Sequence, residues 1–158
     1  MMYRHTARFC LALFLIVPLL LCPAFSAGNL LRAQSKSTVV ILAGYKLNPS
    51  VPTPATGSLT LTVRDDTLTV KGTFSDLKAP YMTGGIYFVQ ERRAVNQLFR
   101  IDADLNETQT GGKLVARKNR FPLSEAHREL LNNGELSIRI SSTQHKLGEI
   151  GAKIPGEW

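Results

Sequence analysis

Apolar and polar residues alternate strictly in two neighbouring stretches of the chain, residues 58–63 and 67–74. Leucine, valine and phenylalanine occupy most of one set of alternate positions, whereas serine, threonine and lysine occupy the other. A period of two, with hydroxyl-bearing residues on the polar face, is typical of strands that are buried on one side only. The turn-forming segment Arg64-Asp65-Asp66 joins the two stretches. The two stretches are therefore predicted to form a β-hairpin.

Short runs rich in β-branched and apolar residues recur along the chain and are separated by proline, glycine and asparagine. They predict further strands at residues 38–44, 85–90, 97–105, 113–117, 135–142 and 147–154. The alternation also predicts which side chains pack inward. These are Leu59, Leu61, Val63, Leu68, Val70, Phe74, Phe99, Ile101, Ile138 and Ile140.

The period of the pattern changes from two to that of a helix just before the last two predicted strands. Ser124 and Glu125 are typical of a helix start, and leucines follow at helical spacings. Asn133 and Gly134 are typical of a helix end. The sequence therefore predicts one short helix in this position.

The number and spacing of these elements predict the fold class. About eight short strands with turn signals between them, and one short helix before the last two strands, favour an all-β fold. We expect an antiparallel β-sandwich or barrel with Greek-key-like connections. The chain lacks the alternation of strands and helices that a parallel sheet requires.

The N-terminal segment has the composition of an export signal. Two arginines precede an apolar run at residues 9–22, and small residues follow it. The run is interrupted by Pro18 and is shorter than the roughly 20 residues that span a bilayer. We therefore expect residues 1–26 to be a signal peptide cleaved near Ser26, with an uncleaved anchor as the alternative. Residues 27–37 are expected to form a flexible lead-in, and residues 155–158 a C-terminal tail.

This leader predicts a secreted or periplasmic protein that contacts the membrane only transiently, through the signal peptide. Both cysteines, Cys10 and Cys22, lie in the leader, so the mature chain is expected to contain no disulfide. A lipid anchor on Cys22 is an alternative. It is less favoured because Leu21 and Pro23 flank the cysteine instead of small residues.

The charge of the chain does not indicate a nucleic-acid partner. The formal charge of the whole chain is +7, and removal of Arg4 and Arg8 with the leader would lower it to +5. Nucleic-acid binding typically requires basic residues interleaved with exposed aromatic residues, or a known binding module. Neither is visible, so a mildly basic solvated surface is predicted.

The segment from the predicted helix to residue 154, LSEAHRELLNNGELSIRISSTQHKLGEIGAKI, resembles the end of the CHRD (chordin-type) domain family. In that family a short helix leads to a glycine, a strand of the form YVNVHT, a turn and the motif GEIRGQI. Gly134 takes the place of the glycine, and Gly148-Glu149-Ile150 matches GEI. The opening LAGYKLNPSVPTPATGSLTLTV is similar to the start of the family, so the resemblance covers residues 38–154.

The chain departs from the family at its histidines. The family carries the motif AHIH on a middle strand, and the resemblance places those two histidines at Gly85 and Tyr87. The histidine of YVNVHT falls on Ser141. These three positions and Glu149 are the family-equivalent candidates for a ligand-facing surface. Glycine, tyrosine and serine do not form a metal site, and Gly151 replaces the arginine of GEIRG.

The remaining side chains indicate no catalytic or metal centre. Beyond the leader the chain has only two histidines, His127 and His145, and neither has a partner at ligand spacing. None of the serines lies in a G-x-S-x-G elbow. We therefore expect no catalytic residue, no metal, no cofactor and no enzymatic activity. A metal-binding protein or metal-dependent enzyme of the cell envelope is the alternative.

Two further sequence features bear on partners. Tyr87, with Arg92 and Arg93 close in sequence, is the best candidate for a ligand-facing patch. Asn106 begins the sequon Asn-Glu-Thr, which matters only if the producing cell is eukaryotic. The sequence therefore predicts an exported CHRD-like module with a non-catalytic binding or structural role. Its partner would be an unknown protein or small ligand.

Overall fold

The computed structural model describes residues 35–91 and 93–158. The predicted signal peptide, and the lead-in up to residue 34, lie outside the described residues. The described chain forms ten strands, one α-helix and one 3-10 turn. In chain order these are β1 Ser35–Ala43, η1 Gly44–Lys46, β2 Thr56–Arg64, β3 Thr67–Ser75, β4 Tyr81–Gln90, β5 Arg93–Ile101, β6 Asp104–Leu105, β7 Gly112–Leu114, β8 Arg120–Pro122, α1 Glu125–Asn132, β9 Leu136–Ser142 and β10 Ile150–Lys153.

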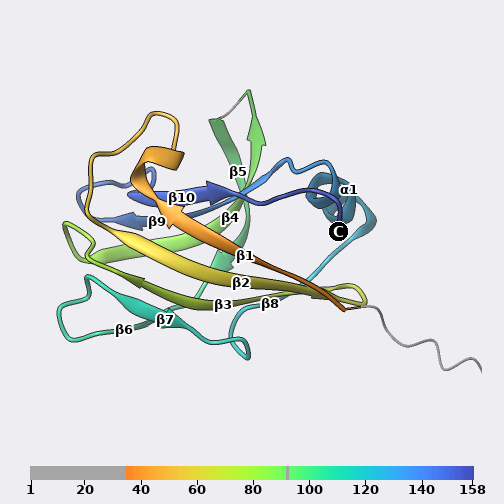
Figure 1. Ribbon diagram of the computed structural model, residues 1–158, viewed down its shortest axis with the longest axis horizontal. Helices are drawn as coiled ribbons and strands as arrows, with labels where there is room; N and C mark the ends of the chain where they lie inside the picture. Colours follow the sequence, from red (N-terminus) through yellow and green to blue (C-terminus); the bar gives the residue numbers. More distant parts are fainter. Residues whose placement is uncertain (1–34, 92) are drawn as a thin grey trace, which may run out of the picture. The chain divides into compact units, whose positions relative to one another are not determined.

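All strand pairs of the sheet are antiparallel, in the order β5-β4-β9-β10-β1-β2-β3-β7-β6, with β8 paired to β3. The sheet curls, so that β1–β3 face the strands β4 and β9 across the interior (Figure 1). The all-β antiparallel prediction with one helix before the last two strands is confirmed, and the curled sheet agrees with the barrel alternative.

The two ends of the strand order are consecutive in the chain. β5 and β6 are separated only by Asp102 and Ala103. Asn119 fixes this junction because its side-chain amide donates to the Asp102 carbonyl at 2.8 Å and its Oδ1 accepts from the Asp102 N–H at 2.8 Å. A second donated bond, 3.1 Å long, reaches the Val115 carbonyl. Asn119 is fully buried, and every polar group of its side chain has a partner.

The core lies on the concave side of this sheet and consists of aliphatic side chains with one phenylalanine in the hairpin. Eight of the ten side chains predicted to pack inward are buried: Leu59, Leu61, Leu68, Val70, Phe74, Ile101, Ile138 and Ile140. The other two, Val63 and Phe99, are partly buried and pack against the same core. The alternation identified the inner face because successive strand side chains point to opposite sides.

Strands differ from the sequence prediction in several places, among them β8, which was not predicted, and β7, which ends at Leu114 instead of Arg117. β1 begins at Ser35, three residues inside the segment expected to be a lead-in, because residues 35–37 pair with β2. β4 begins at Tyr81 instead of Gly85, because its first residues pair with β9. One strand was predicted for residues 97–105, but β5 ends at Ile101, where the chain crosses to β6.

The helix α1 has the predicted ends, with one unexpected participant. The Ser124 hydroxyl accepts from the His127 N–H at 3.3 Å, and His127 Nδ1 accepts from the Ser124 N–H at 3.4 Å. This is a capping box in which histidine replaces the usual glutamate. At the other end Gly134 has a φ of +66°, which glycine adopts without a Cβ penalty.

Within residues 35–91 and 93–158, no helix is both long and apolar enough to cross a membrane.

Candidate functional site

Three of the four family-equivalent positions lie on two paired strands. Gly85 and Tyr87 belong to β4, and Ser141 belongs to β9, where it lies opposite Thr83. Residues 83, 85 and 87 alternate with the buried Ile86, so these three positions share the outer face of the sheet. A Cβ at Gly85 would lie 2.5 Å from the Gln97 side-chain nitrogen. The space above Gly85 is therefore filled by Gln97.

The fourth position, Glu149, immediately precedes β10 and is fully buried. Its Oε1 accepts a 2.6 Å hydrogen bond from the Thr53 hydroxyl and a 2.8 Å hydrogen bond from the Lys78 N–H. It thereby ties the proline-rich loop after η1 and the β3–β4 connection to the start of β10. Glu149 acts as a structural bridge at this end of the sheet.

The Glu149 carboxylate is held in its charged form. Burial by itself raises the pKa of this group. The neighbouring Ser142 hydroxyl and the bonds from Thr53 and Lys78 oppose burial, as does the nearby His145, so the pKa lies below its usual range.

The residue that sequence reasoning missed is Arg139. It lies on β9 directly opposite Gly85 of β4 and opposite Gly151 of β10. The resemblance places the family arginine at Gly151, so this chain carries its guanidinium on the neighbouring strand. Cross-strand partners cannot be read from one sequence, although a single arginine in the apolar strand LSIRISS was a visible signal.

The Arg139 guanidinium has few hydrogen-bond partners and no carboxylate partner in the described chain. Its Nη1 donates to the Leu147 carbonyl at 3.2 Å, whereas its Nε is buried and has no hydrogen-bond partner among the described residues. Arg139 also takes part in none of the ion pairs found within the described chain. Burial lowers the pKa of Arg139, and the neighbouring Tyr87 opposes this shift. Burial likewise raises the pKa of Tyr87, against the effect of Arg139.

Arg139 lies at the junction of two adjoining cavities that share Leu47, Asn48 and Arg139. We call them together the Arg139 groove. One cavity, of about 650 Å³, lies between the loop after η1 and the β9–β10 loop, which Figure 1 shows at the same end of the sheet. Its lining is Leu47, Asn48, Pro49, Val51, Tyr87, Arg93, Ala94, Arg139, Gln144, His145, Lys146, Leu147 and Gly148.

The second cavity of the groove, of about 670 Å³, extends along β9 and β10 toward the start of β9. Its lining is Lys46, Leu47, Asn48, Val89, Glu91, Gly134, Glu135, Ser137, Arg139, Ala152 and Lys153. Leu47, which lines both cavities, lies close to the backbone of Gly151. A Cβ at Gly151 would lie 2.6 Å from the Leu47 side chain. The missing side chain lets Leu47 pack against β10.

Buried polar atoms without partners concentrate in the Arg139 groove. Four such side-chain atoms are found in the described chain: Ser137 Oγ, Arg139 Nε, His145 Nε2 and Glu149 Oε2. The first three belong to residues that line the groove, and the fourth follows the groove residue Gly148. Buried polar groups are nearly always hydrogen-bonded, so water or a bound molecule has to supply the partners of these atoms.

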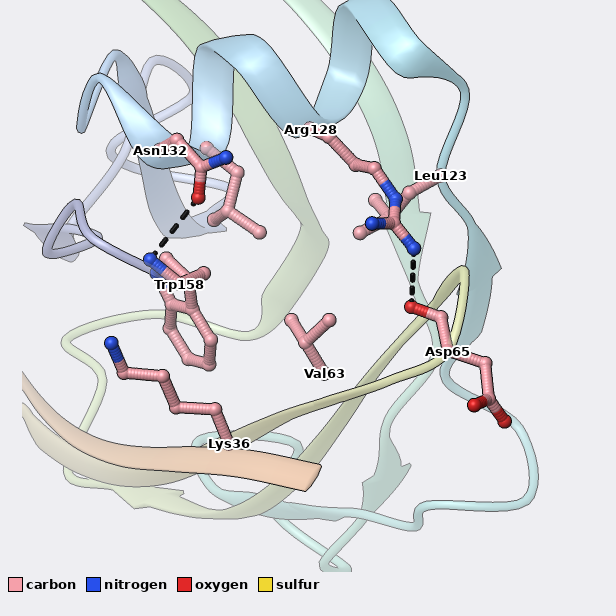
Figure 2. A pocket seen from close by; sticks show the side chains of 8 residues that line it. Lys36, Val63, Asp65, Leu123, Arg128, Asn132 and Trp158 are labelled. Carbon is pink, nitrogen blue, oxygen red and sulfur yellow. Dashed lines mark hydrogen bonds between the residues drawn. The ribbon is translucent and has the colours of Figure 1, made fainter. Parts of the chain in front are cut away.

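A third cavity, of about 420 Å³, lies between α1, the hairpin β2–β3 and the C-terminal tryptophan (Figure 2). Two hydrogen bonds cross it. The Trp158 backbone N–H donates to Asn132 Oδ1 at 3.1 Å, and Arg128 Nη2 donates to the Asp65 carbonyl at 2.6 Å. The bonds hold the C-terminal tail and the hairpin to the helix. None of the unpartnered buried atoms of the described chain belongs to the residues that line this cavity.

The two histidines take different places. His127 caps α1 and lies edge-on to Phe99, with ring centroids 4.9 Å apart. His145 lines the Arg139 groove. Among the residues that the structure describes, no three histidine, cysteine, aspartate or glutamate side chains form a group able to hold a metal ion.

Of the patch predicted around Tyr87, Tyr87 itself and Arg93 line the groove together. Arg92 lies outside the described residues. Gly85 and Ser141 share the outer face but are not part of the groove lining, and Glu149 supports the loops beside it.

Comparison with known proteins adds one match. The family model described as the CHRD domain matches residues 38–154, the same range that the sequence resemblance covers. Neither curated proteins nor solved structures give a match.

Proposed function

The chain belongs to the CHRD domain family, and from this premise we propose that it is an exported, non-catalytic module that binds a ligand through the Arg139 groove. The observation that supports binding is the concentration of unpartnered buried atoms, Ser137 Oγ, Arg139 Nε and His145 Nε2, in one groove. Each such atom lowers stability until it is solvated or bonded. A bound molecule that supplies the missing partners recovers that free energy.

The size and construction of the groove support the same proposal. Each of its two cavities is within the 300–1,000 Å³ range of small-molecule sites. Its walls come from regular strands, from the loop after η1 that Glu149 bonds through Thr53, and from the β9–β10 loop. A site of this kind is largely formed before the ligand arrives.

A binding role without catalysis is favoured by the chemistry of the lining. Arg139, Arg93, Lys46 and Lys146 are cationic, and none of them has the base and orienting acid that activate a nucleophile. The two acids, Glu91 and Glu135, line only the second cavity. The cations of the groove are therefore suited to holding a molecule.

Export is supported by the order of basic, apolar and small residues in residues 1–26. The test is the mass and N-terminal sequence of the protein recovered from the periplasm or medium of the producing cell. A mature chain starting near Ala27 is expected. Intact Met1 in the cytoplasm would contradict export, and a lipidated N-terminus at Cys22 would replace it with the lipoprotein alternative.

Ligand binding is tested by screening the protein recovered from an exporting host against a library of small, neutral and charged compounds by two-dimensional NMR. Shifted amides are expected to cluster at residues 46–49, 137–139 and 144–148. Hits confined to the cavity at Trp158, or no hits, would contradict the site. Metal analysis of the same sample separates binding from the metal-dependent alternative, since a stoichiometric tightly held ion would favour the latter.

A further inference from the structure

The first cavity of the Arg139 groove, between the loop after η1 and the β9–β10 loop, has a single sign of charge. Arg93, Arg139 and Lys146 line it together with His145, and no aspartate or glutamate is among its described lining residues. Glu149 is the acid nearest in sequence to His145 and Lys146. Its Oε1 already accepts hydrogen bonds from Thr53 and Lys78. A concave surface with one sign of charge raises the local concentration of the opposite ion.

Among the cations that line this cavity, Arg139 would be stabilised most by a bound anion. Its guanidinium is partly withdrawn from water and has no carboxylate partner in the described chain. A partly buried charge without a counter-ion is unfavourable, and an arginine that meets a carboxylate or phosphate forms charge-assisted hydrogen bonds. The Tyr87 hydroxyl, on the neighbouring strand, is a further donor in the same cavity.

Apolar side chains from two loops line this cavity on either side of its cationic residues. Leu47, Pro49 and Val51 of the loop after η1 face it from one side, and Leu147 of the β9–β10 loop from the other. Leu147 is 88% exposed, so its side chain is free to contact a molecule bound in the cavity. The cavity therefore combines a cationic floor with apolar rims.

From this combination we infer that the Arg139 groove takes an organic anion, with its acidic group at Arg139 and its apolar body between Leu47 and Leu147. The inference rests on the proposed binding function and specifies its ligand chemistry. Inorganic phosphate would satisfy the cation but leave the apolar rims uncovered.

The inference is tested with three probes that share one apolar body: phenylbutanoate, phenylbutanol and phenylbutylammonium. Dissociation constants are measured by NMR titration of the protein recovered from an exporting host. We expect phenylbutanoate to bind at least about tenfold more tightly than phenylbutanol, which is the size of one hydrogen bond to a charged group. We expect phenylbutylammonium to bind most weakly and inorganic phosphate to bind more weakly than phenylbutanoate.

Matched variants locate the effect. Arg139→Gln should remove most of the preference for the anion over the alcohol, whereas Arg139→Lys should retain part of it. Arg139 is partly buried, so its substitution could also affect folding. Lys146→Gln and Leu147→Ser change exposed residues that line the same cavity. Leu147→Ser should weaken phenylbutanoate and phenylbutanol equally. Lys113→Gln, an exposed charge change on β7, should alter neither.

The outcomes separate this inference from the proposed function. If phenylbutanol binds the groove as tightly as phenylbutanoate, the anion preference is wrong while the groove remains a ligand site. If Lys113→Gln weakens the anion as much as Arg139→Gln, the effect is one of net charge and the inference is also wrong. If no probe or library compound shifts the groove amides, both proposals fail.

Discussion

Glu149 Oε1 and the Thr53 hydroxyl are 2.6 Å apart although 96 residues separate them in the chain. The bond joins the proline-rich loop to the start of β10, and the Lys78 N–H bonds to the same oxygen. The loop forms one wall of the Arg139 groove. The GEI glutamate therefore positions one wall of the proposed site without lining it.

Removing this carboxylate should destabilise the protein. Glu149→Ala leaves the Lys78 N–H and the Thr53 hydroxyl without their acceptor, and each bond to a charged group is worth about 1.5–3 kcal/mol. We expect the free energy of unfolding to fall by about 2–5 kcal/mol in urea titrations. The control is Glu107→Ala in the exposed β6–β7 turn, where a change within about 0.5 kcal/mol is expected. Equal losses in the two variants would contradict the bridging role.

Stability should decrease at acidic pH through the same group. The pKa of Glu149 is lower in the folded protein than in the unfolded chain. The contribution of Glu149 is therefore complete above the unfolded pKa of about 4.3 and is lost as the pH falls through the folded value. We expect Glu149→Gln to reduce the difference in unfolding free energy between about pH 6 and pH 3.

Asp104 provides the control for this pH dependence. The Lys118 ammonium hydrogen-bonds to its exposed carboxylate and lowers its pKa, so it acts in the same direction. Surface pairs are screened by water and contribute little. Asp104→Asn should therefore flatten the pH profile less than Glu149→Gln. A larger effect at Asp104 would mean that the buried carboxylate is not the main acid-sensitive group.

The junction between β5 and β6 should depend on Asn119. Asn119→Ala removes three hydrogen bonds, two to the Asp102 backbone and one to the Val115 carbonyl. We expect a loss of about 2–4 kcal/mol, since each of the three bonds contributes about 0.5–1.5 kcal/mol. Hydrogen exchange should accelerate first at the β5–β6 junction. Asn96→Ala, at an exposed position of β5, should leave both measurements unchanged.

The inner face of β9 should respond as a packed core. Ile138 is fully buried, and Ile138→Ala is expected to lower the unfolding free energy by about 2–4 kcal/mol. Val39 is 61% exposed on β1, so Val39→Ala should change it by less than about 0.5 kcal/mol. A loss below that value at Ile138 would place that side of β9 outside the core.

The sequence by itself determined the fold class and the core. Alternation in residues 58–63 and 67–74 identified the hairpin and its buried face because strand periodicity is a local property. The ends of α1 were equally local, since Ser124 and Gly134 act on backbone groups within a few residues. The family resemblance followed from the order of such segments.

The tertiary structure alone decided which strands are neighbours, and with them the candidate site. Arg139 lies opposite Gly85 and Gly151, and Glu149 reaches Thr53, only because β9 pairs with both β4 and β10. The bonds between Asn119 and Asp102 likewise join residues that are 17 positions apart in the chain. Contacts between residues far apart in sequence depend on pairing and register, which alternation along a single strand does not encode.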